Sequence, residues 1–260
     1  MPTPLRLIAL ALFALIPLPA LAEPSPAATA AFNAYAASIE ARLARQHQSA
    51  ASFLTLQHLP ITQPVIENLT PSSRDFPGAM LHHWRGTAFA PGATAAQFEA
   101  ILRNLSNYTK VFAPEVTKAG QLGGPEKPSD ANHIQAYLRL RQHHVLTVVL
   151  DSNYEIAFSA LDPQHRSSLS RSTHIAEIAS PDTSSEHALS PADEHGFLWR
   201  LNTYWSWEER PEGLYLQIET ISLTRSIPPG LGWAVGPFVQ SIPRESLEFT
   251  LRSACNALRK

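Results

Sequence analysis

The feature that most constrains the fold of this chain is the stretch 196–258. Two runs rich in aromatic and β-branched residues, 197–208 and 214–223, flank the turn sequence Arg210-Pro211-Glu212-Gly213, which predicts a long antiparallel β-hairpin. From Pro243 onward, apolar residues recur at helical spacing and predict an amphipathic helix. Since hairpin and helix each have one apolar face to cover, together they predict a sheet curled around the last helix.

Composition and charge limit the class of protein. The 260 residues are 44% hydrophobic and 16% charged, which is enough for one core of ordinary size. The formal net charge is -2 and no block of Lys and Arg occurs, so nothing electrostatic favours nucleic acid or an anionic membrane surface as a partner. Cys255 is the single cysteine, which excludes a disulfide within the chain and a cysteine-based zinc cluster.

Residues 1–22 are typical of a cleavable secretory signal. Arg6 precedes an apolar run over 7–18, and Ala20-Leu21-Ala22 matches the small-residue cleavage pattern. The run is shorter than the roughly 20 residues that a membrane-spanning helix needs, although an uncleaved anchor is the competing interpretation. We therefore expect cleavage after Ala22, a periplasmic or secreted location, and no integral membrane segment in the mature chain.

The rest of the chain divides into an N-terminal part and a main domain. Residues 23–79 predict a tether, a helix and a loop, and 80–260 predict the main domain. In the first part, Phe32, Tyr35, Ile39 and Leu43 share one helical stripe. Thr94 is a suitable N-cap for a second helix, and a short helical piece is expected over 108–116. Strands are expected at 81–89, 134–140, 145–150, 155–161 and 172–179, before the hairpin.

Three segments resemble a known superfamily. HHWRGTAFAPGATAAQFEAILRNL, GFLWRLNTYWSWEE and ISLTRSIPPGLGWAVGPFVQSIPRESLEFTL resemble the START-like (SRPBCC) superfamily of polyketide cyclases and lipid-transfer domains, and within it a set of exported bacterial members without an assigned activity. The resemblance implies an α+β helix-grip fold, in which a curved antiparallel sheet wraps around a long C-terminal helix and a pocket lies between them. The N-terminal helix is extra to this plan. The resemblance carries over no catalytic residue, because the superfamily shares no catalytic motif.

The hairpin contains most of the candidate ligand-binding residues. Strand alternation places Arg200, Asn202 and Tyr204 on one face of the first run, and that face mixes aromatic with polar groups. Such a mixture is typical of a pocket with apolar walls and a few convergent polar groups, so we expect some of these residues, together with Glu219 of the returning run, to point into one. The alternative is that this face is the hydrated outer one, with cross-strand pairs that stabilise the sheet.

Two further sets of residues are weaker candidates. Arg139 alternates with leucines in an earlier strand, a position for which exposure to solvent is the first expectation. If Arg139 pointed inward, it would need Glu219 or an acidic ligand as partner. Trp233 and Phe238 lie in the glycine-rich stretch 230–238, which predicts a flap over the mouth of a pocket or, alternatively, a tightly packed turn.

Motifs for metal or cofactor chemistry are absent from the sequence. The adjacent histidines at 82–83 and 143–144 point to opposite faces of a strand, and no HExxH, GxSxG or phosphate-binding loop occurs. We expect no metal and no cofactor. The favoured hypothesis is an exported carrier of a small hydrophobic or amphipathic molecule, held between the sheet and the C-terminal helix. A cyclase or hydratase using Arg200, Tyr204 or Glu219, and a protein-interaction module with a filled core, are the alternatives.

Overall fold

The computed structural model describes residues 23–55, 63–72, 76–123, 132–143, 147–227 and 232–259. The expected signal, residues 1–22, lies outside the described part of the chain. The strands are β1 (Val65–Asn68), β2 (Ala79–Pro91), β3 (Val116–Gln121), β4 (His133–His143), β5 (Thr147–Ala160), β6 (His165–Ala179), β7 (His187–Ala188), β8 (Arg200–Arg210) and β9 (Gly213–Arg225).

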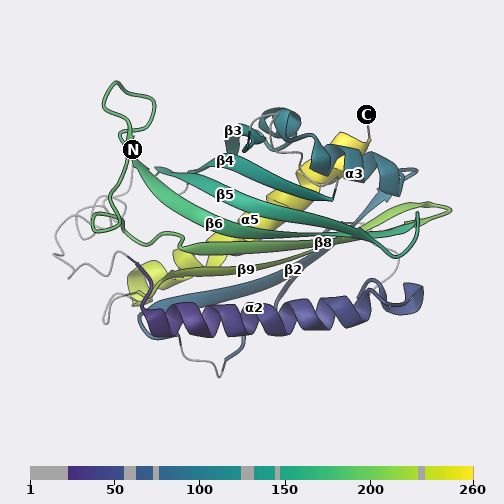
Figure 1. Cartoon of the computed structure of the whole chain (residues 1–260), viewed down its shortest axis with the longest axis horizontal. Coiled ribbons are helices and arrows are strands. Elements are labelled where there is room, and N and C mark those ends of the chain that lie inside the picture. The colour runs from purple at the N-terminus through teal and green to yellow at the C-terminus, as the bar shows by residue number, and fades with distance from the viewer. Residues whose placement is uncertain are drawn as a thin grey trace.

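All strand pairs in the described residues are antiparallel, and the sheet has the order β1-β2-β9-β8-β6-β5-β4-β3, with β7 pairing with β6. The helices are α2 (Pro26–Gln46), α3 (Ala95–Arg103), α4 (Tyr108–Val111) and α5 (Gly232–Leu258), with the short 3₁₀ turns η1 (Ala50–Ser52) and η2 (Leu105–Asn107). In Figure 1, α5 crosses behind the strands of the sheet and α2 runs along its other side.

The two sides of the sheet have separate cores. On the side that we call the α5 face, Trp205 and Trp207 of β8 pack with Phe98 of α3 and with Leu247 and Leu251 of α5. On the opposite side, the α2 face, side chains of α2 pack against β2, β8 and β9; the buried members of this cluster are Phe32, Tyr35, Ala36, Ile39, Leu43, Phe76, Leu81, Trp199, Tyr204, Ile221 and Leu223. The sheet is therefore covered by a helix on each face.

The central sequence expectations are confirmed. The hairpin forms with β8 and β9 in register from Arg200↔Leu223 to Arg210↔Gly213. At its turn, a Cβ on Gly213 would lie 2.4 Å from the Ala90 carbonyl oxygen, so this position requires glycine. The N-cap expected at Thr94 is also present, since its hydroxyl accepts from the Gln97 backbone amide in a capping box.

Several boundaries differ from the expectation. From Thr147 to Ala160, a single strand, β5, takes the place of the two strands that were expected at 145–150 and 155–161, and its register with β6 shifts between Asn153 and Tyr154. Positions 145 and 146 lie outside the described residues. The short strands β1 and β3 were not expected, because neither has a run of alternating residues long enough to stand out. Helix α5 begins at Gly232 rather than at Pro243, so the glycine-rich stretch is helical from that residue instead of forming a flap.

The N-terminal part joins the same sheet as the rest. The expected boundary at residue 80 falls at the start of β2, and β1 from the N-terminal part pairs with that strand. Helix α2 begins after the N-cap Ser25, whose hydroxyl accepts from the Ala28 amide, and Pro26 occupies the first turn. Its buried stripe matches the one expected from the sequence, and it contacts the second face of the hairpin.

Candidate functional site

The polar residues of the hairpin lie under α2. Neighbouring residues of β8 point to opposite faces, so Trp205 packs in the α5-face core while Tyr204 packs in the α2-face core. Asn202 and Glu219 lie on the Tyr204 side, and both are nearly fully buried. These three residues therefore do not face α5. The face of the hairpin that they share is covered by α2, so it is not the hydrated outer surface that was the alternative expectation.

Glu219 is the centre of a buried polar chain. Its carboxylate accepts hydrogen bonds from Arg42 of α2 and is 2.9 Å from Nε2 of His83, whose Nδ1 is 2.7 Å from the Tyr35 hydroxyl. Burial alone would raise the pKa of Glu219, but the hydrogen bonds from His83 and Arg42 outweigh it and lower the pKa to about 2. Glu219 is therefore an ionised group that holds α2 on the sheet.

Tyr204 and Asn202 form a second polar contact with α2. The Asn202 amide donates to the Tyr204 hydroxyl at 3.2 Å, and that hydroxyl donates to Glu40 at 3.1 Å. Arg171 of β6 donates two hydrogen bonds to the same Glu40 carboxylate. Burial and the nearby Glu40 charge raise the pKa of Tyr204, so it stays a neutral donor.

The other expected site residues lie elsewhere. Arg139 is 7% exposed and pairs with Asp151 at 2.6 Å and with Glu186 at 2.6 Å, so it ties a loop to the sheet and does not meet Glu219. Arg200 donates to the neighbouring Trp199 carbonyl at 2.8 Å. Trp233 and Phe238 belong to α5, but their side chains lie outside the described residues.

The described part of α5 packs closely on the sheet. Leu251 and Ala254 are fully buried, and Leu247 is 3% exposed. A Cβ on Gly86 of β2 would lie 2.4 Å from Leu251 Cδ1, which shows how near the helix comes to this strand. At these positions, side chains of α5 thus contact the sheet directly.

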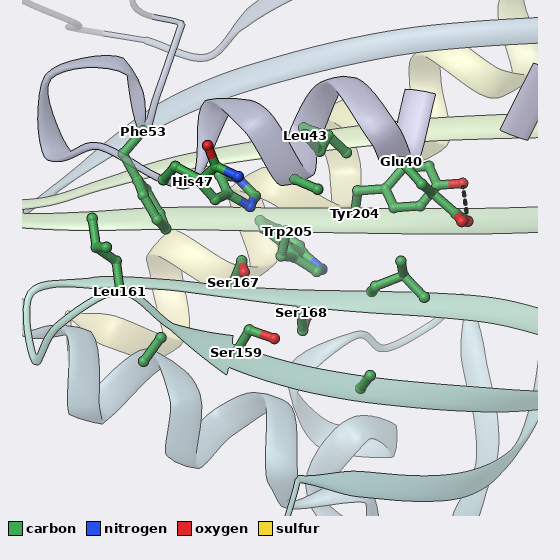
Figure 2. Close-up of a pocket in the computed structure, with 15 residues that line it drawn as sticks. Glu40, Leu43, His47, Phe53, Ser159, Leu161, Ser167, Ser168, Tyr204 and Trp205 are labelled. Atoms are coloured by element: carbon green, nitrogen blue, oxygen red, sulfur yellow. Dashed lines mark hydrogen bonds between the residues drawn. The ribbon is translucent and has the colours of Figure 1, made fainter. Parts of the chain in front are cut away.

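A groove opens instead on the α2 face, between the C-terminal half of α2 and strands β5, β6 and β8. It encloses about 530 Å³. Its lining residues are Glu40, Leu43, Ala44, His47, Gln48, Phe53, Ala157, Ser159, Ala160, Leu161, Ser167, Ser168, Leu169, Tyr204 and Trp205. Figure 2 shows Glu40 and Tyr204 at one end of the groove and Phe53 and Leu161 at the other.

His47 and Phe53 close part of the groove above the sheet. Their rings stack with centroids 4.5 Å apart, and His47 Nε2 lies 2.8 Å from the Ser206 hydroxyl. Burial, with a smaller contribution from the positive charge of Arg42, lowers the pKa of His47 to about 4, so its ring is neutral near pH 7. Phe53 is itself 1% exposed, so this wall of the groove is fixed by packing.

Of the residues named from sequence, Tyr204 lines this groove, while Asn202 and Glu219 lie beside it under α2. His47, Phe53 and Ser167 were missed. The apolar stripe of α2 was enough to predict the helix. No sequence pattern predicts that this helix, which lies outside the expected main domain, covers the hairpin. Among the described residues, no group of three His, Cys, Asp or Glu side chains is placed to hold a metal ion.

In the part of the chain that the structure describes, no helix is both long enough and apolar enough to cross a bilayer.

Comparison with known proteins gives similarity in structure only. No protein-family model and no curated protein matches the sequence. Among solved structures, a STAR-related lipid transfer protein from Xanthomonas axonopodis is 17% identical, with 72% of this chain and 97% of that chain covered and a TM-score of 0.46. An aromatase/cyclase from a Streptomyces species is 15% identical, covering 69% and 92%, with a TM-score of 0.44.

A START superfamily protein from Mycobacterium smegmatis is 14% identical, covering 70% of this chain and 97% of that chain, with a TM-score of 0.40. Identities this low say nothing of ligand or reaction. The arrangement of its own antiparallel sheet and C-terminal helix gives this chain the α+β helix-grip fold that the sequence predicted.

Proposed function

We propose that this protein binds a small hydrophobic or amphipathic molecule in the groove between α2 and the sheet, and carries or sequesters it in the periplasm or outside the cell. The observation that carries the proposal is the composition of the groove. Apolar side chains such as Leu43, Phe53 and Leu169 form part of its walls, and polar side chains lie among them, a mixture that is typical of a site for an amphipathic molecule.

The dimensions of the groove support a ligand of modest size. Its volume of about 530 Å³ falls within the range of roughly 300–1,000 Å³ that small-molecule sites occupy. The lining includes Glu40, Leu43 and Ala44 of α2 and continues to His47 and Gln48, which follow the helix. The helical part from Glu40 to Gln46 is about 9 Å long at 1.5 Å per residue. A compact molecule or a single medium-length chain fits this span better than a lipid with two long chains.

The mouth of the groove gives a route for entry. Leu161, in the turn between β5 and β6, lines the groove and is 43% exposed, while the other large hydrophobic side chains of the described residues are at least partly buried. An exposed leucine beside an apolar groove provides a first contact for an apolar ligand. The secretory signal expected over residues 1–22 supports the exported location.

The hypothesis of a cyclase or hydratase has less support. It requires a carboxyl group that faces a cavity and is poised to exchange a proton, and Glu219 was the candidate. Glu219 is instead paired with Arg42 and His83 beneath α2, and its lowered pKa keeps it ionised.

Groove-filling variants test the proposed function. Ala44 is exposed on α2 and lines the groove, so Ala44→Trp places an indole in it. Ala41 is exposed on the same helix outside the groove, which makes Ala41→Trp the matched control. The measurements are native mass spectrometry of protein purified from its own host and thermal shift across lipids, isoprenoids and aromatic compounds.

We expect wild type and Ala41→Trp to retain a ligand or to be stabilised by one, and Ala44→Trp to lose both signals. An empty wild-type protein without any thermal shift would favour the protein-interaction module. Equal binding by both tryptophan variants would remove the groove as the site.

A further inference from the structure

Several hydroxyl groups line the groove, and that of Ser167 is the one on which this inference rests. Ser167 of β6 lines the groove and is 8% exposed, and it lies on the α2 face opposite Ser206 of β8. Within the described parts of the chain, the Ser167 hydroxyl makes no hydrogen bond. Figure 2 shows Ser167 on its strand below His47, the residue that follows α2. A serine hydroxyl offers one donor and two acceptor positions, so the Ser167 hydroxyl can hydrogen-bond to an alcohol or a carbonyl group of a ligand that reaches it.

The charges around the groove disfavour an ionised ligand. No Lys or Arg is among the residues that line it in the described structure, so a carboxylate or phosphate finds no cation there. Glu40 is the one carboxylate in the lining, and Arg171 and Tyr204 already occupy it. An ammonium group would therefore have to compete with Arg171 for Glu40. Burying either kind of charge without a partner is unfavourable.

From these two observations, and resting on the proposed function, we infer that the ligand is a neutral amphiphile whose alcohol or ketone group hydrogen-bonds to Ser167. Apolar groups lie on both sides of this hydroxyl along the groove. Leu169 is two residues further along the same strand, and Leu161 and Phe53 lie toward the open end. We therefore expect the polar group of the ligand to lie at Ser167 and an apolar end of the ligand to reach Leu161.

Matched single-chain compounds separate the alternatives. Calorimetric titration of the mature protein at pH 7.5 compares 1-decanol, 2-decanone, decanoate and decylamine, each below its aggregation concentration. We expect decanol and decanone to bind at least about 10-fold more tightly than decanoate or decylamine, because the charged groups lose solvation without gaining a free partner.

The variant Ser167→Ala tests the named hydroxyl. It is expected to weaken decanol and decanone about 5- to 10-fold and to leave decanoate unchanged. Ser170 lies on the same strand but on the opposite face, so Ser170→Ala is the control and is expected to bind like wild type.

Each outcome is decisive. Decanoate or decylamine binding as tightly as decanol, or an unchanged decanol affinity in Ser167→Ala, would overturn this inference. In either case, loss of binding of these compounds in Ala44→Trp would still support the proposed function, because it would show that they bind in the groove. No binding of any of the four compounds, together with an empty protein from the host, would overturn both.

Discussion

Arg42 of α2 and Glu219 of β9 form an ion pair across 177 positions of sequence, with Arg42 Nη2 donating to both carboxylate oxygens. Glu219 is 2% exposed, and its second partner, His83, is 3% exposed. A carboxylate buried to this degree is tolerated because it is paired and hydrogen-bonded. The pair therefore fixes α2 against the sheet, next to the groove.

The first prediction concerns pH. The pKa of Glu219 is lowered from 4.5 to about 2 in the folded protein, so the unfolded chain binds the proton more tightly. The stability from this group is then fully present above about pH 4.5 and is lost as the pH falls toward 2. We expect Glu219→Gln to reduce the free energy of unfolding at pH 7 by roughly 3 kcal/mol, and to flatten its decrease between pH 5 and pH 2. Urea unfolding followed by circular dichroism at several pH values measures both effects.

Glu248→Gln is the control for that experiment. Glu248 pairs with Arg252 on the exposed side of α5, at the i,i+4 spacing. An exposed pair of this kind contributes less than about 1 kcal/mol, so this variant should keep the wild-type pH profile. A Glu219→Gln variant whose stability fell with acid as steeply as wild type would contradict the assigned role of the pair.

The hairpin shows what the sequence could predict. Aromatic and β-branched alternation around Pro211 and Gly213 was enough to place both strands, and the leucine spacing was enough to place the end of α5. These signals are local, since they depend on residues that are neighbours along one element. The start of α5 was misplaced because Gly232, Gly236 and Pro237 are weak helix formers, and the sequence gives no sign that they continue the helix.

The candidate site could not be predicted in the same way. Alternation separates Tyr204 from Trp205, but it does not say which of the two faces a given helix covers. Contacts such as Arg42 with Glu219 and His47 with Ser206 join segments more than 150 residues apart, and no spacing pattern encodes them. The burial of the polar face of the hairpin under α2 could therefore not be predicted from the sequence.

The second prediction concerns the close approach of α5 to β2. A methyl group at Gly86 would lie 2.4 Å from Leu251 Cδ1 and 3.0 Å from Ile66 Cδ1. Leu251 is fully buried and has little room to move, so we expect Gly86→Ala to lower the free energy of unfolding by about 1–3 kcal/mol. Gly120 of β3 has no atom within 4 Å of such a methyl group, and Gly120→Ala should be neutral or slightly stabilising. Equal thermal stability of the two variants would contradict this packing.

The third prediction concerns the loop before β8. Glu177 is 4% exposed, and its carboxylate accepts from the backbone amides of His195, Gly196 and Phe197 at 2.8–3.0 Å. An amide side chain cannot replace all of these acceptor positions, so Glu177→Gln should leave backbone donors unpaired. We expect faster hydrogen exchange over residues 190–199 and a loss of about 1–3 kcal/mol in stability. Glu194→Gln is a suitable comparison, since it removes charge from the same loop but contributes one hydrogen bond, to the Glu177 amide.

The last prediction concerns the grip of the sheet on α5. Leu251 has no exposed surface and packs in the same cluster as Trp205, Trp207 and Phe98. Leu251→Ala leaves a cavity there and is expected to lower the free energy of unfolding by about 2–5 kcal/mol, whereas Leu251→Asp should prevent folding because it buries an unpaired charge. The exposed neighbour Arg252 provides the control, and Arg252→Ala should change stability by less than about 0.5 kcal/mol. Chemical denaturation measures the alanine variants, and a soluble Leu251→Asp protein with a cooperative thermal transition would show that α5 is not clasped as described.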